Sequence, residues 1–385
     1  MIPPTPTALP AASSRADAAH SAASSRAPAA PPAHRMPHEG APQARTWMTW
    51  PAADYMLDGS HAPRESVWRA WAGVANTIHE FQPVTVLVDP AHLDSARRHL
   101  STGVEQLVTP VDDAWMRDSG PSFVLAAESS RLTAVSWEFN AWGGLELAGT
   151  GADNEIAARV AAAAGTDLLR SSMVNEGGGI HVDGAGTVLV TETVQLDPRR
   201  NPGWSRTDVE RELARTIGAE KAIWIERGLH RDYGPLGTRG HIDMVATFSE
   251  PGAVLLHAQR DPSHPDHELS NALRTRLPQE RDARDRPLTV IDLPAPRVLR
   301  DREGWVDYSY VNHALVNGAV IACAFADPAD AEAAAILGDA YPARAVIGID
   351  ARPIFALGGG IHCITQQQPA MPLPPRAASP APLPR

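Results

Sequence analysis

The stretch Phe355-Ala-Leu-Gly-Gly-Gly-Ile-His-Cys-Ile-Thr-Gln-Gln-Gln-Pro369 lies near the C-terminus and decides how the rest of the chain is interpreted. An apolar, strand-like run from Ala345 to Ile349 precedes it. The three glycines Gly358 to Gly360 permit a tight turn and let a ligand or another strand approach the main chain closely. Cys363 follows this turn among polar residues, so the pattern predicts a thiol that is presented to a ligand and not merely buried.

The two cysteines of the chain have different surroundings. Cys323 lies in the apolar run Ala319 to Phe325 and is expected to be an ordinary core residue. Cys363 has glycines, His362 and Thr365 as neighbours, which favours a reactive thiol although a lone cysteine is most often a small core side chain. A nucleophilic cysteine needs a partner from elsewhere in the fold, commonly a histidine.

With 385 residues, of which 43% are hydrophobic, the chain can form one large domain or two ordinary ones. Two cysteines cannot build a disulfide framework, and no Cys/His spacing is typical of a structural zinc site, so a reducing cytoplasm is the expected location. The formal net charge of -11 disfavours nucleic acid and anionic membranes as partners and favours small cations. No apolar run approaches the ~18 residues of a membrane span. The sequence leaves a homo-oligomer open.

Three segments differ in composition. Residues 1–45 are rich in Ala, Pro, Ser and Arg and nearly lack large apolar side chains, so they are predicted to be a disordered extension. Residues 371–385 form a Pro-rich tail that is also expected to be disordered. Residues 46–370 are therefore expected to be a single folded domain.

One pattern recurs five times within that domain: a helical stretch, a β-branched strand, a polar loop and another strand. The expected helices span residues 91–101, 153–164, 207–217, 264–276 and 328–337. The expected polar loops span residues 112–121, 175–184, 237–243 and 307–312 and the loop around Cys363. A unit that repeats about every 60 residues favours a closed or stacked array over a doubly wound sheet. Five units closed around an axis would point their loops at one central cleft.

Each of these loops carries a different set of polar side chains. They are Trp115, Arg117 and Asp118, then Glu176, then His241 and Asp243, then Asn312, and finally His362 and Cys363. An ordinary turn or a satisfied core residue explains any one of them alone, but the five sets together indicate a site. His241 and Asp243 begin an apolar strand, where alternation would place both on one face. A metal site on this pair lacks a clear third and fourth ligand, so neither a metal nor a cofactor is expected.

A thiol, an imidazole and three carboxylates suit a guanidinium as the bound group. A guanidinium is planar, delocalised and cationic, and carboxylates bind it by paired hydrogen bonds of matching geometry. Two carboxylates that hold its nitrogens leave the central carbon open to a thiolate. The expected partner is therefore a small cationic guanidino substrate.

The polar loops and glycine-rich stretches resemble those of the agmatine deiminase family, which is related to bacterial peptidylarginine deiminases. The segments that carry the resemblance are Asp112-Asp-Ala-Trp-Met-Arg-Asp-Ser-Gly-Pro121, Phe139-Asn-Ala-Trp-Gly-Gly144, Asn175-Glu-Gly-Gly-Gly-Ile-His-Val-Asp-Gly184, Thr191-Glu192, Arg200-Asn-Pro202, Gly240-His-Ile-Asp243, Ser309-Tyr-Val-Asn312 and Gly358-Gly-Gly-Ile-His-Cys-Ile-Thr-Gln-Gln367. They run in family order between Trp47 and Pro369. The resemblance implies an α/β fold of the pentein type, a five-bladed propeller of pseudo-symmetric ββαβ-type repeats around a central active-site cleft.

The resemblance also implies roles for individual residues. Cys363 would be the nucleophile, His241 the general acid and base, and Glu176 the residue that orients His241. Asp118 and Asp243 would hold the guanidinium. Attack of Cys363 on the guanidinium carbon would release ammonia, and water activated by His241 would hydrolyse the thiouronium to a ureido product. The reaction implied for the family converts agmatine to N-carbamoylputrescine and ammonia, without metal or cofactor.

The remaining expected substrate contacts are Trp115, as an aromatic wall, Asn312 and Arg239. Arg239 departs from the family, which usually carries an acidic or amide residue just before Gly-His, and residues 52–56 and 145–152 also depart from it. An arginine near the pocket would repel an ammonium tail and attract a carboxylate, whereas an arginine in a surface ion pair would do neither. Arginine or another carboxylated guanidino compound is therefore the main alternative substrate.

Two alternatives come from other classes of protein. An amidinotransferase has this type of fold and the same covalent intermediate, but it passes the amidine to an amine instead of water. A binding protein without activity is the third interpretation. It is disfavoured because all five expected loops hold residue types that are competent for the chemistry.

Overall fold

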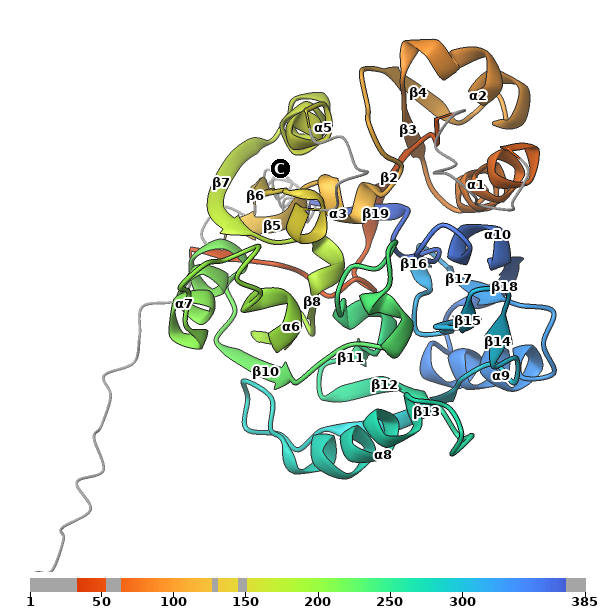
Figure 1. Ribbon diagram of the computed structural model, residues 1–385. Coiled ribbons are helices and arrows are strands. Elements are labelled where there is room, and N and C mark those ends of the chain that lie inside the picture. Colours follow the sequence, from red (N-terminus) through yellow and green to blue (C-terminus); the bar gives the residue numbers. More distant parts are fainter. Residues whose placement is uncertain (1–32, 53–63, 127–130, 145–150, 372–385) are drawn as a thin grey trace, which may run out of the picture. The chain divides into compact units, whose positions relative to one another are not determined.

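The computed structural model describes residues 33–52, 64–126, 131–144 and 151–371. All of them belong to the unit Pro32–Arg385. Figure 1 shows that the strands of this unit form several small sheets placed around a common centre. Segments that are distant in the sequence therefore meet where the sheets face one another.

The sheet that contains β5 shows the repeated order of elements. β5 (Ser122–Ala126) pairs antiparallel with β6 (Leu132–Glu138), and α5 (Ile156–Ala164) then leads to β7 (Asp167–Val174), which pairs parallel with β6. A parallel pair needs a crossover connection, and α5 supplies it. The helix ends at Gly165, which adopts the left-handed conformation typical of a helix C-terminus.

Four further sheets repeat this ββαβ order. They are β8 (Ile180–Val182), β9 (Thr187–Thr191), α7 (Arg206–Ile217) and β10 (Lys221–Ile225); β11 (Ala246–Glu250), β12 (Ala253–Ala258), α8 (His267–Arg276) and β13 (Thr289–Pro294); β16 (Ala314–Val316), β17 (Ala319–Ala324), α9 (Asp330–Ala340) and β18 (Ala345–Asp350); and β19 (Thr365–Pro369), β2 (Gln43–Thr49), α1 (Arg64–His79) and β3 (Val84–Val88). The prediction of five ββαβ units is confirmed.

The smaller elements connect or extend these units. They are α2 (Leu93–His99), β4 (Glu105–Val108), α3 (Met116–Ser119), α4 (Ala141–Gly144), α6 (Glu192–Gln195), β14 (Arg300–Asp301), β15 (Gly304–Trp305) and α10 (Arg352–Phe355). β4 extends the last unit by pairing parallel with β3. β14 and β15 form a separate two-stranded hairpin.

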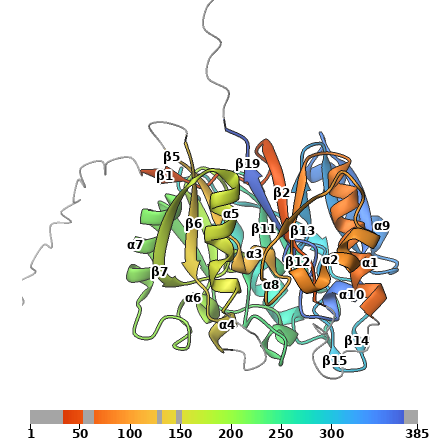
Figure 2. The same ribbon diagram turned by 90° about the horizontal axis from the view of Figure 1, so that it is seen from above.

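The last unit joins the two ends of the described chain. β19 pairs antiparallel with β2, so that Gln366 lies opposite Trp47. Figure 2 shows these two strands side by side. Because β19 directly follows the Cys363 loop, this pairing fixes the loop against the beginning of the chain.

The predicted boundary at residue 45 is wrong for residues 33–45. β1 (His34–Arg35) pairs antiparallel with β5, and the following segment lies in the interior, where Met36, Glu39 and Gln43 are buried. This segment is held by polar contacts, since Gln43 Nε2 donates to the carbonyls of Glu39 and Leu315. A scarcity of apolar side chains therefore did not indicate disorder here. The rest of the two expected disordered tails, residues 1–32 and 372–385, lies outside the described residues.

The expected helices are present with small shifts of their ends. α7 has a complete capping box, in which Ser205 and Asp208 bond each other's backbone N–H groups, and it ends at Gly218 in the left-handed conformation. Its residues Val209, Leu213 and Ile217 are buried in one core with Val188 and Val190 of β9. The helix expected from residue 264 begins only at His267.

Two local predictions need correction. β8 runs inside segment 175–184, which was expected to be a loop, because its three residues are too few to show alternation. His241 and Asp243 do not lie on a strand, since Ile242–Met244 form a 3₁₀ turn and the strand starts at Ala246. Strand alternation therefore does not place these two side chains on one face.

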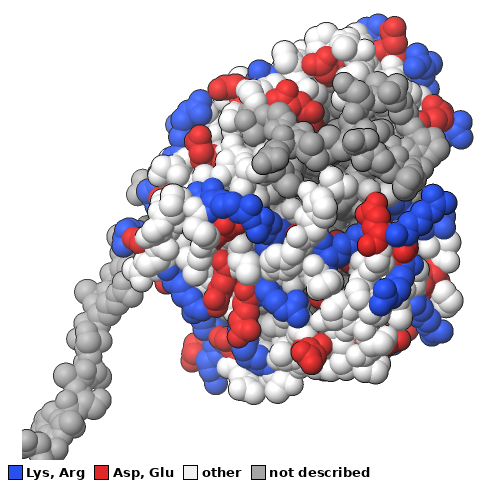
Figure 3. Space-filling model, in the orientation of Figure 1, with Lys and Arg blue, Asp and Glu red and all other residues white. Residues whose placement is uncertain are grey.

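The surface carries both signs of charge. Figure 3 shows acidic and basic side chains interspersed over one face. Many exposed arginines in the described residues pair with nearby acids, for example Arg352 with Asp350 at 2.7 Å. Among the helices of the described chain, none has the length and apolar character needed to cross a bilayer.

Candidate active site

Five loops occupy the same place in the five units, directly before the first strand of each. α3 precedes β5, the 3₁₀ turns Gly177–Gly179 and Ile242–Met244 precede β8 and β11, residues 307–313 precede β16, and residues 358–364 precede β19. All five sets of polar side chains predicted from the sequence lie on these loops. The distances between them show that the loops converge.

Cys363 lies at the end of the glycine-rich loop and is buried. Its Sγ atom is 3.3 Å from Nδ2 of Asn312 and 3.6 Å from Oδ2 of Asp243. The backbone N–H of Arg117 donates to the Cys363 carbonyl at 3.0 Å. Three loops from different units thus meet at the thiol.

Trp115 forms a wall beside this thiol. A Cβ atom at position 359 would lie 2.7 Å from the Trp115 ring and 3.1 Å from the Cys363 sulfur, so only glycine fits between them. The Trp115 ring is itself held edge to face against Trp71, with centroids 5.9 Å apart. The predicted aromatic wall is therefore next to Cys363, and its contact with substrate stays a prediction.

His241 is completely buried and faces two carboxylates. Its Nε2 atom is 3.2 Å from Oε2 of Glu176 and, because a carboxylate only accepts, Nε2 carries a proton. Its Nδ1 atom is 3.9 Å from Oδ1 of Asp118. No described residue forms a hydrogen bond with Nδ1. A Cβ at position 178 would come within 2.4 Å of Nδ1, so glycine is required there too.

The main chain at His241 is fixed by the buried carboxylate of Asp232. Oδ2 of Asp232 accepts hydrogen bonds from the N–H groups of Gly240 at 2.7 Å and His241 at 3.0 Å, while Oδ1 accepts from Thr238 N–H. These bonds hold a loop whose backbone is unusual, with φ of 72° at Arg239 and 120° at Gly240. Asp232 therefore positions the imidazole from behind.

Glu176 is held by a buried ion pair. Nε of Arg200 lies 2.9 and 3.1 Å from its two oxygens, and both side chains are inaccessible to solvent. Burial alone would raise the pKa of Glu176, but Arg200 and the hydrogen bond to His241 lower this pKa to about 2. Glu176 is therefore a fixed anion that orients His241.

Asp118 is placed by hydrogen bonds from two other segments. Nε1 of Trp142 donates to Oδ2 at 2.9 Å, and the backbone N–H of Gly178 donates to Oδ1 at 3.1 Å. Trp142 has a left-handed backbone with φ of 53°, which turns its indole toward Asp118. Burial raises the pKa of Asp118 to about 6, while His241 opposes the shift and Asp243 adds to it.

Asp243 has one engaged oxygen and one without a partner. Oδ2 accepts from Nδ1 of His362 at 2.7 Å. Oδ1 is buried and has no hydrogen bond from any described residue. Burial opposes ionisation of Asp243, but the hydrogen bond and charge of His362 lower its pKa. Asp243 thus presents a free oxygen of a buried anion beside Cys363.

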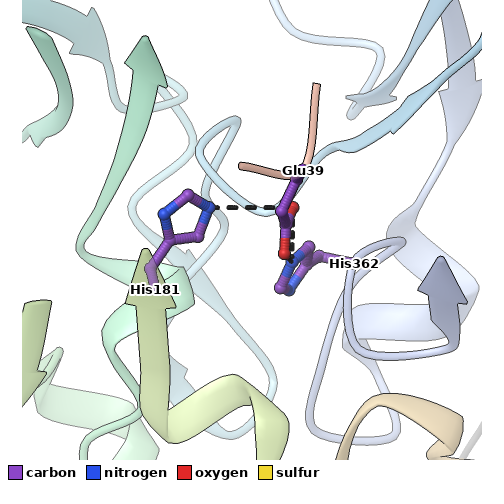
Figure 4. Close-up of side chains that lie close together, drawn as sticks. All are labelled: Glu39, His181 and His362. Atoms are coloured by element: carbon purple, nitrogen blue, oxygen red, sulfur yellow. Dashed lines mark hydrogen bonds and ion pairs between the residues drawn. The ribbon is translucent and has the colours of Figure 1, made fainter. Parts of the chain in front are cut away.

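The second ring nitrogen of His362 contacts Glu39. Nε2 of His362 lies 3.0 and 3.1 Å from the two oxygens of Glu39, and Nε2 of His181 lies 3.7 Å from the same carboxylate. Figure 4 shows Glu39 between the two imidazole rings. In the part of the chain that is described, these three side chains are the group close enough to bind one metal ion.

The hydrogen bonds of this group fit an ion-pair network better than a metal site. Nδ1 of His181 accepts the backbone N–H of Phe248, so its Nε2 carries the proton and offers no lone pair to a metal. His362 has a carboxylate at each ring nitrogen. Glu39 is also paired with Nη1 of Arg117 at 3.0 Å. The residues present therefore do not form a metal-binding set.

The charges set the resting state of the thiol and the imidazole. Burial opposes protonation of His241, but Asp118 and Glu176 raise its pKa to about 9. Burial, and then Asp243 and Asp118, raise the pKa of the Cys363 thiol well above its usual value. At neutral pH the site therefore holds a neutral thiol, an imidazolium and ionised carboxylates.

The structure brings most of the predicted site residues together. They are Cys363, His241, Glu176, Asp118, Asp243, Asn312 and Trp115. Arg239 is different, because its Nε lies 3.4 Å from Oδ2 of Asp197 and its side chain is 37% exposed. Asp197 also lies 3.4 Å from Nη1 of Arg200. Of the other departures from the family, residues 53–56 and 145–150 lie outside the described residues.

Four residues of the site were not among the candidate residues named from the sequence. Trp142 and Arg200 lie in segments that carried the family resemblance, so the resemblance could have identified them as candidates. Asp232 lies in a turn of ordinary composition, and only the loop geometry identifies it. No feature of the sequence indicated Glu39, since it lies in the segment that was expected to be disordered.

A ring of five ββαβ units with a buried thiol, an imidazole and three carboxylates at its centre defines the class of the molecule. It is a pentein enzyme of the type that modifies guanidino groups. More particularly, the chain belongs to the Porphyromonas-type peptidyl-arginine deiminase family, whose sequence model matches residues 35–369.

Agmatine deiminases are among its relatives in that family. A protein of Streptomyces coelicolor, provisionally named agmatine deiminase, is 51% identical over 336 residues, which cover 87% of this chain and 98% of that protein. The agmatine deiminase of Stutzerimonas stutzeri is 38% identical over 87% of this chain and 95% of its own length. The solved structure of the agmatine deiminase of Enterococcus faecalis matches with a TM-score of 0.80 and 32% identity, over 88% of this chain and 96% of that one. The family resemblance and the pentein fold predicted from the sequence are confirmed.

Proposed function

We propose that this protein hydrolyses the guanidino group of agmatine to give N-carbamoylputrescine and ammonia. The observation that carries the proposal is a pair of buried polar atoms without hydrogen bonds from the described residues, Oδ1 of Asp243 and Nδ1 of His241. A buried donor or acceptor left unpaired costs about 1–3 kcal/mol. These two atoms belong to the loops that converge near Cys363, where a ligand can satisfy them. A guanidinium N–H supplies the donor that Oδ1 of Asp243 lacks and can donate to Asp118 as well. Nδ1 of the His241 imidazolium carries a proton that no described residue accepts.

Binding of the substrate cation prepares the nucleophile. The two carboxylates that hold the guanidinium, Asp118 and Asp243, are those that raise the pKa of the Cys363 thiol in the free enzyme. A bound cation offsets their charge and stabilises the thiolate, and the thiol proton is released to solvent. Sγ then forms a bond to the guanidinium carbon.

Ammonia leaves in the next step. The imidazolium of His241 donates its proton to one guanidinium nitrogen as the bond from that nitrogen to carbon breaks. The products of this step are ammonia, a cationic thiouronium on Cys363 and a neutral His241. Glu176, hydrogen-bonded to Nε2, keeps the ring oriented throughout.

Water completes the reaction. Neutral His241 accepts a proton from a water molecule as the water oxygen bonds to the thiouronium carbon. Collapse of this adduct breaks the carbon–sulfur bond, passes the hydroxyl proton to the sulfur and releases the ureido product, so that the Cys363 thiol and the His241 imidazolium are both restored. A thiol used in this way must stay reduced, so the proposal includes the cytoplasmic location expected from the sequence.

Agmatine is the proposed substrate because relatives that align with most of this chain are named agmatine deiminases. The alternative substrate, arginine, was favoured by the charge of Arg239. That charge is paired with Asp197, which weakens the attraction for a substrate carboxylate. The ion pair therefore favours agmatine over arginine.

Steady-state ammonia release from agmatine, arginine and shorter guanidino acids tests this proposal. We expect kcat/KM to be highest for agmatine, with N-carbamoylputrescine as the only organic product. A higher kcat/KM for arginine would overturn the substrate assignment. A new guanidino compound, formed without ammonia when an amine is added, would show an amidinotransferase instead.

A further inference from the structure

A chain of four charged side chains runs from the thiol to the N-terminal segment. Oδ2 of Asp243 lies 3.6 Å from Sγ of Cys363 and 2.7 Å from Nδ1 of His362, whose Nε2 lies 3.0 Å from Glu39. Arg117 pairs with the same oxygen of Glu39 at 3.0 Å. Asp243, His362, Glu39 and Arg117 are all buried, so these contacts are shielded from solvent. The reaction steps above use only Asp243 among them.

The position between two carboxylates makes His362 an imidazolium. Each ring nitrogen faces an acceptor, and only a doubly protonated ring can donate to both. Burial and Arg117 lower the pKa of His362, but Glu39 and Asp243 outweigh them and raise it. Without Glu39, His362 would lose one of the two carboxylates that keep its ring doubly protonated.

The charge on His362 controls what Asp243 can bind. A buried carboxylate near a second carboxylate tends to take up a proton, and a protonated Asp243 would be a poor acceptor for a guanidinium. The imidazolium engages Oδ2, keeps the group ionised and leaves Oδ1 free. The charge and orientation of Asp243 therefore depend on His362, a residue that takes no part in the reaction steps.

Glu39 is itself firmly placed. Nη1 of Arg117 and Nε2 of His181 approach its carboxylate, and His181 is fixed in turn by the Phe248 N–H. Burial opposes ionisation of Glu39, but His362, Arg117 and His181 bring its pKa well below the usual range. Three further titratable groups are influenced by its charge: His38, His313 and Tyr341.

We propose that Glu39 is a positioning residue of the deiminase site: it holds His362 as an imidazolium, which keeps Asp243 ionised and oriented toward the guanidinium. This inference rests on the proposed function. It assigns a role to the segment between β1 and β2, which delivers the carboxylate from the beginning of the described chain to the back of the site.

The direct test compares Glu39→Gln with the wild-type enzyme in agmatine hydrolysis from pH 6 to 10. Glutamine keeps the shape but removes the charge. We expect kcat/KM at pH 8 to fall about tenfold or more, mainly through a higher KM, because a change of one pKa unit in a coupled group is a tenfold effect. The alkaline loss of kcat/KM should also move to lower pH, since His362 loses its proton more easily.

Two variants separate this role from a structural one. Glu39→Asp keeps the charge and is expected to lie between the wild type and Glu39→Gln in KM. Asp183→Asn makes the same chemical change at a buried carboxylate that binds the N–H groups of Ala185 and Thr187 in the β8–β9 turn. It is expected to lower the melting temperature without raising KM.

A second measurement does not depend on turnover. In ¹⁵N-histidine NMR spectra, the His362 ring, assigned by its loss in His362→Gln, should remain doubly protonated at pH 7.5 in the wild type and titrate at lower pH in Glu39→Gln. An unchanged ring charge together with an unchanged KM would overturn the inference. If the wild type hydrolyses no guanidino compound, the proposed function fails, and the NMR titration alone decides whether Glu39 controls the charge of His362.

Discussion

Nδ1 of His241 lies 3.9 Å from Oδ1 of Asp118, and no described residue forms a hydrogen bond with that nitrogen. The other ring nitrogen is bound to Glu176. An imidazole held by one nitrogen, with the other near the carboxylate of Asp118, is suited to deliver a proton to a group bound by Asp118.

The first prediction concerns the charge behind His241. Glu176 helps raise the pKa of His241 to about 9, so Glu176→Gln should lower it. The imidazolium would then be lost at lower pH, and the alkaline fall in kcat should move down. A pH–rate profile measures the shift, and an unmoved alkaline limit would exclude Glu176 as the group that tunes His241.

The second prediction separates substrate binding from thiol ionisation. Asp243 is proposed to bind the substrate cation, and its charge helps raise the pKa of the Cys363 thiol. Asp243→Asn removes both effects. Agmatine hydrolysis should fall by at least about 100-fold, the scale of one charged hydrogen bond of ~3 kcal/mol. Alkylation of Cys363 by iodoacetamide at pH 8 should become faster. A parallel loss of both rates would indicate damage to the fold instead.

The third prediction concerns selectivity. Because Arg239 is paired with Asp197 and partly exposed, Arg239→Gln should change the ratio of kcat/KM for agmatine and arginine by less than about threefold, as for other exposed ion pairs. Parallel assays with both substrates give the ratio. A tenfold loss confined to arginine would assign Arg239 to the substrate site.

The fourth prediction concerns the wall beside the thiol. Gly359→Ala places a methyl group 2.7 Å from the Trp115 ring, so the ring or the Cys363 loop must move. We expect a large loss of kcat and a lower melting temperature. Gly73→Ala, in α1 with nothing within 4 Å of the new Cβ, is the matched control and should be neutral or stabilising.

Much of the fold could be predicted because local signals agree with the final structure. α7 has an apolar stripe, a capping box and a terminal glycine, and each marks the same element. β8 has three residues and therefore shows no period. The segment around Glu39 is stabilised by buried polar contacts, which composition does not reveal.

The residues of the site also divide into those that the sequence could predict and those that it could not. Cys363, His241, Asp118 and Asp243 could be proposed because glycine-rich loops placed unusual polar residues at equivalent positions of a repeat. Asp232 acts through backbone N–H groups, and such a contact leaves no pattern of residue types. Supporting residues of this kind become visible only when the loops have been placed in space.

The proposed reaction depends on a covalent bond between Sγ of Cys363 and the guanidinium carbon. Mass spectrometry of enzyme quenched in acid during agmatine turnover tests it directly. We expect an adduct with the mass of agmatine less ammonia on the peptide that contains Cys363, and no turnover in Cys363→Ala. Cys323→Ser should keep both the adduct and the activity. Full turnover by Cys363→Ala, or an adduct on another residue, would contradict the account.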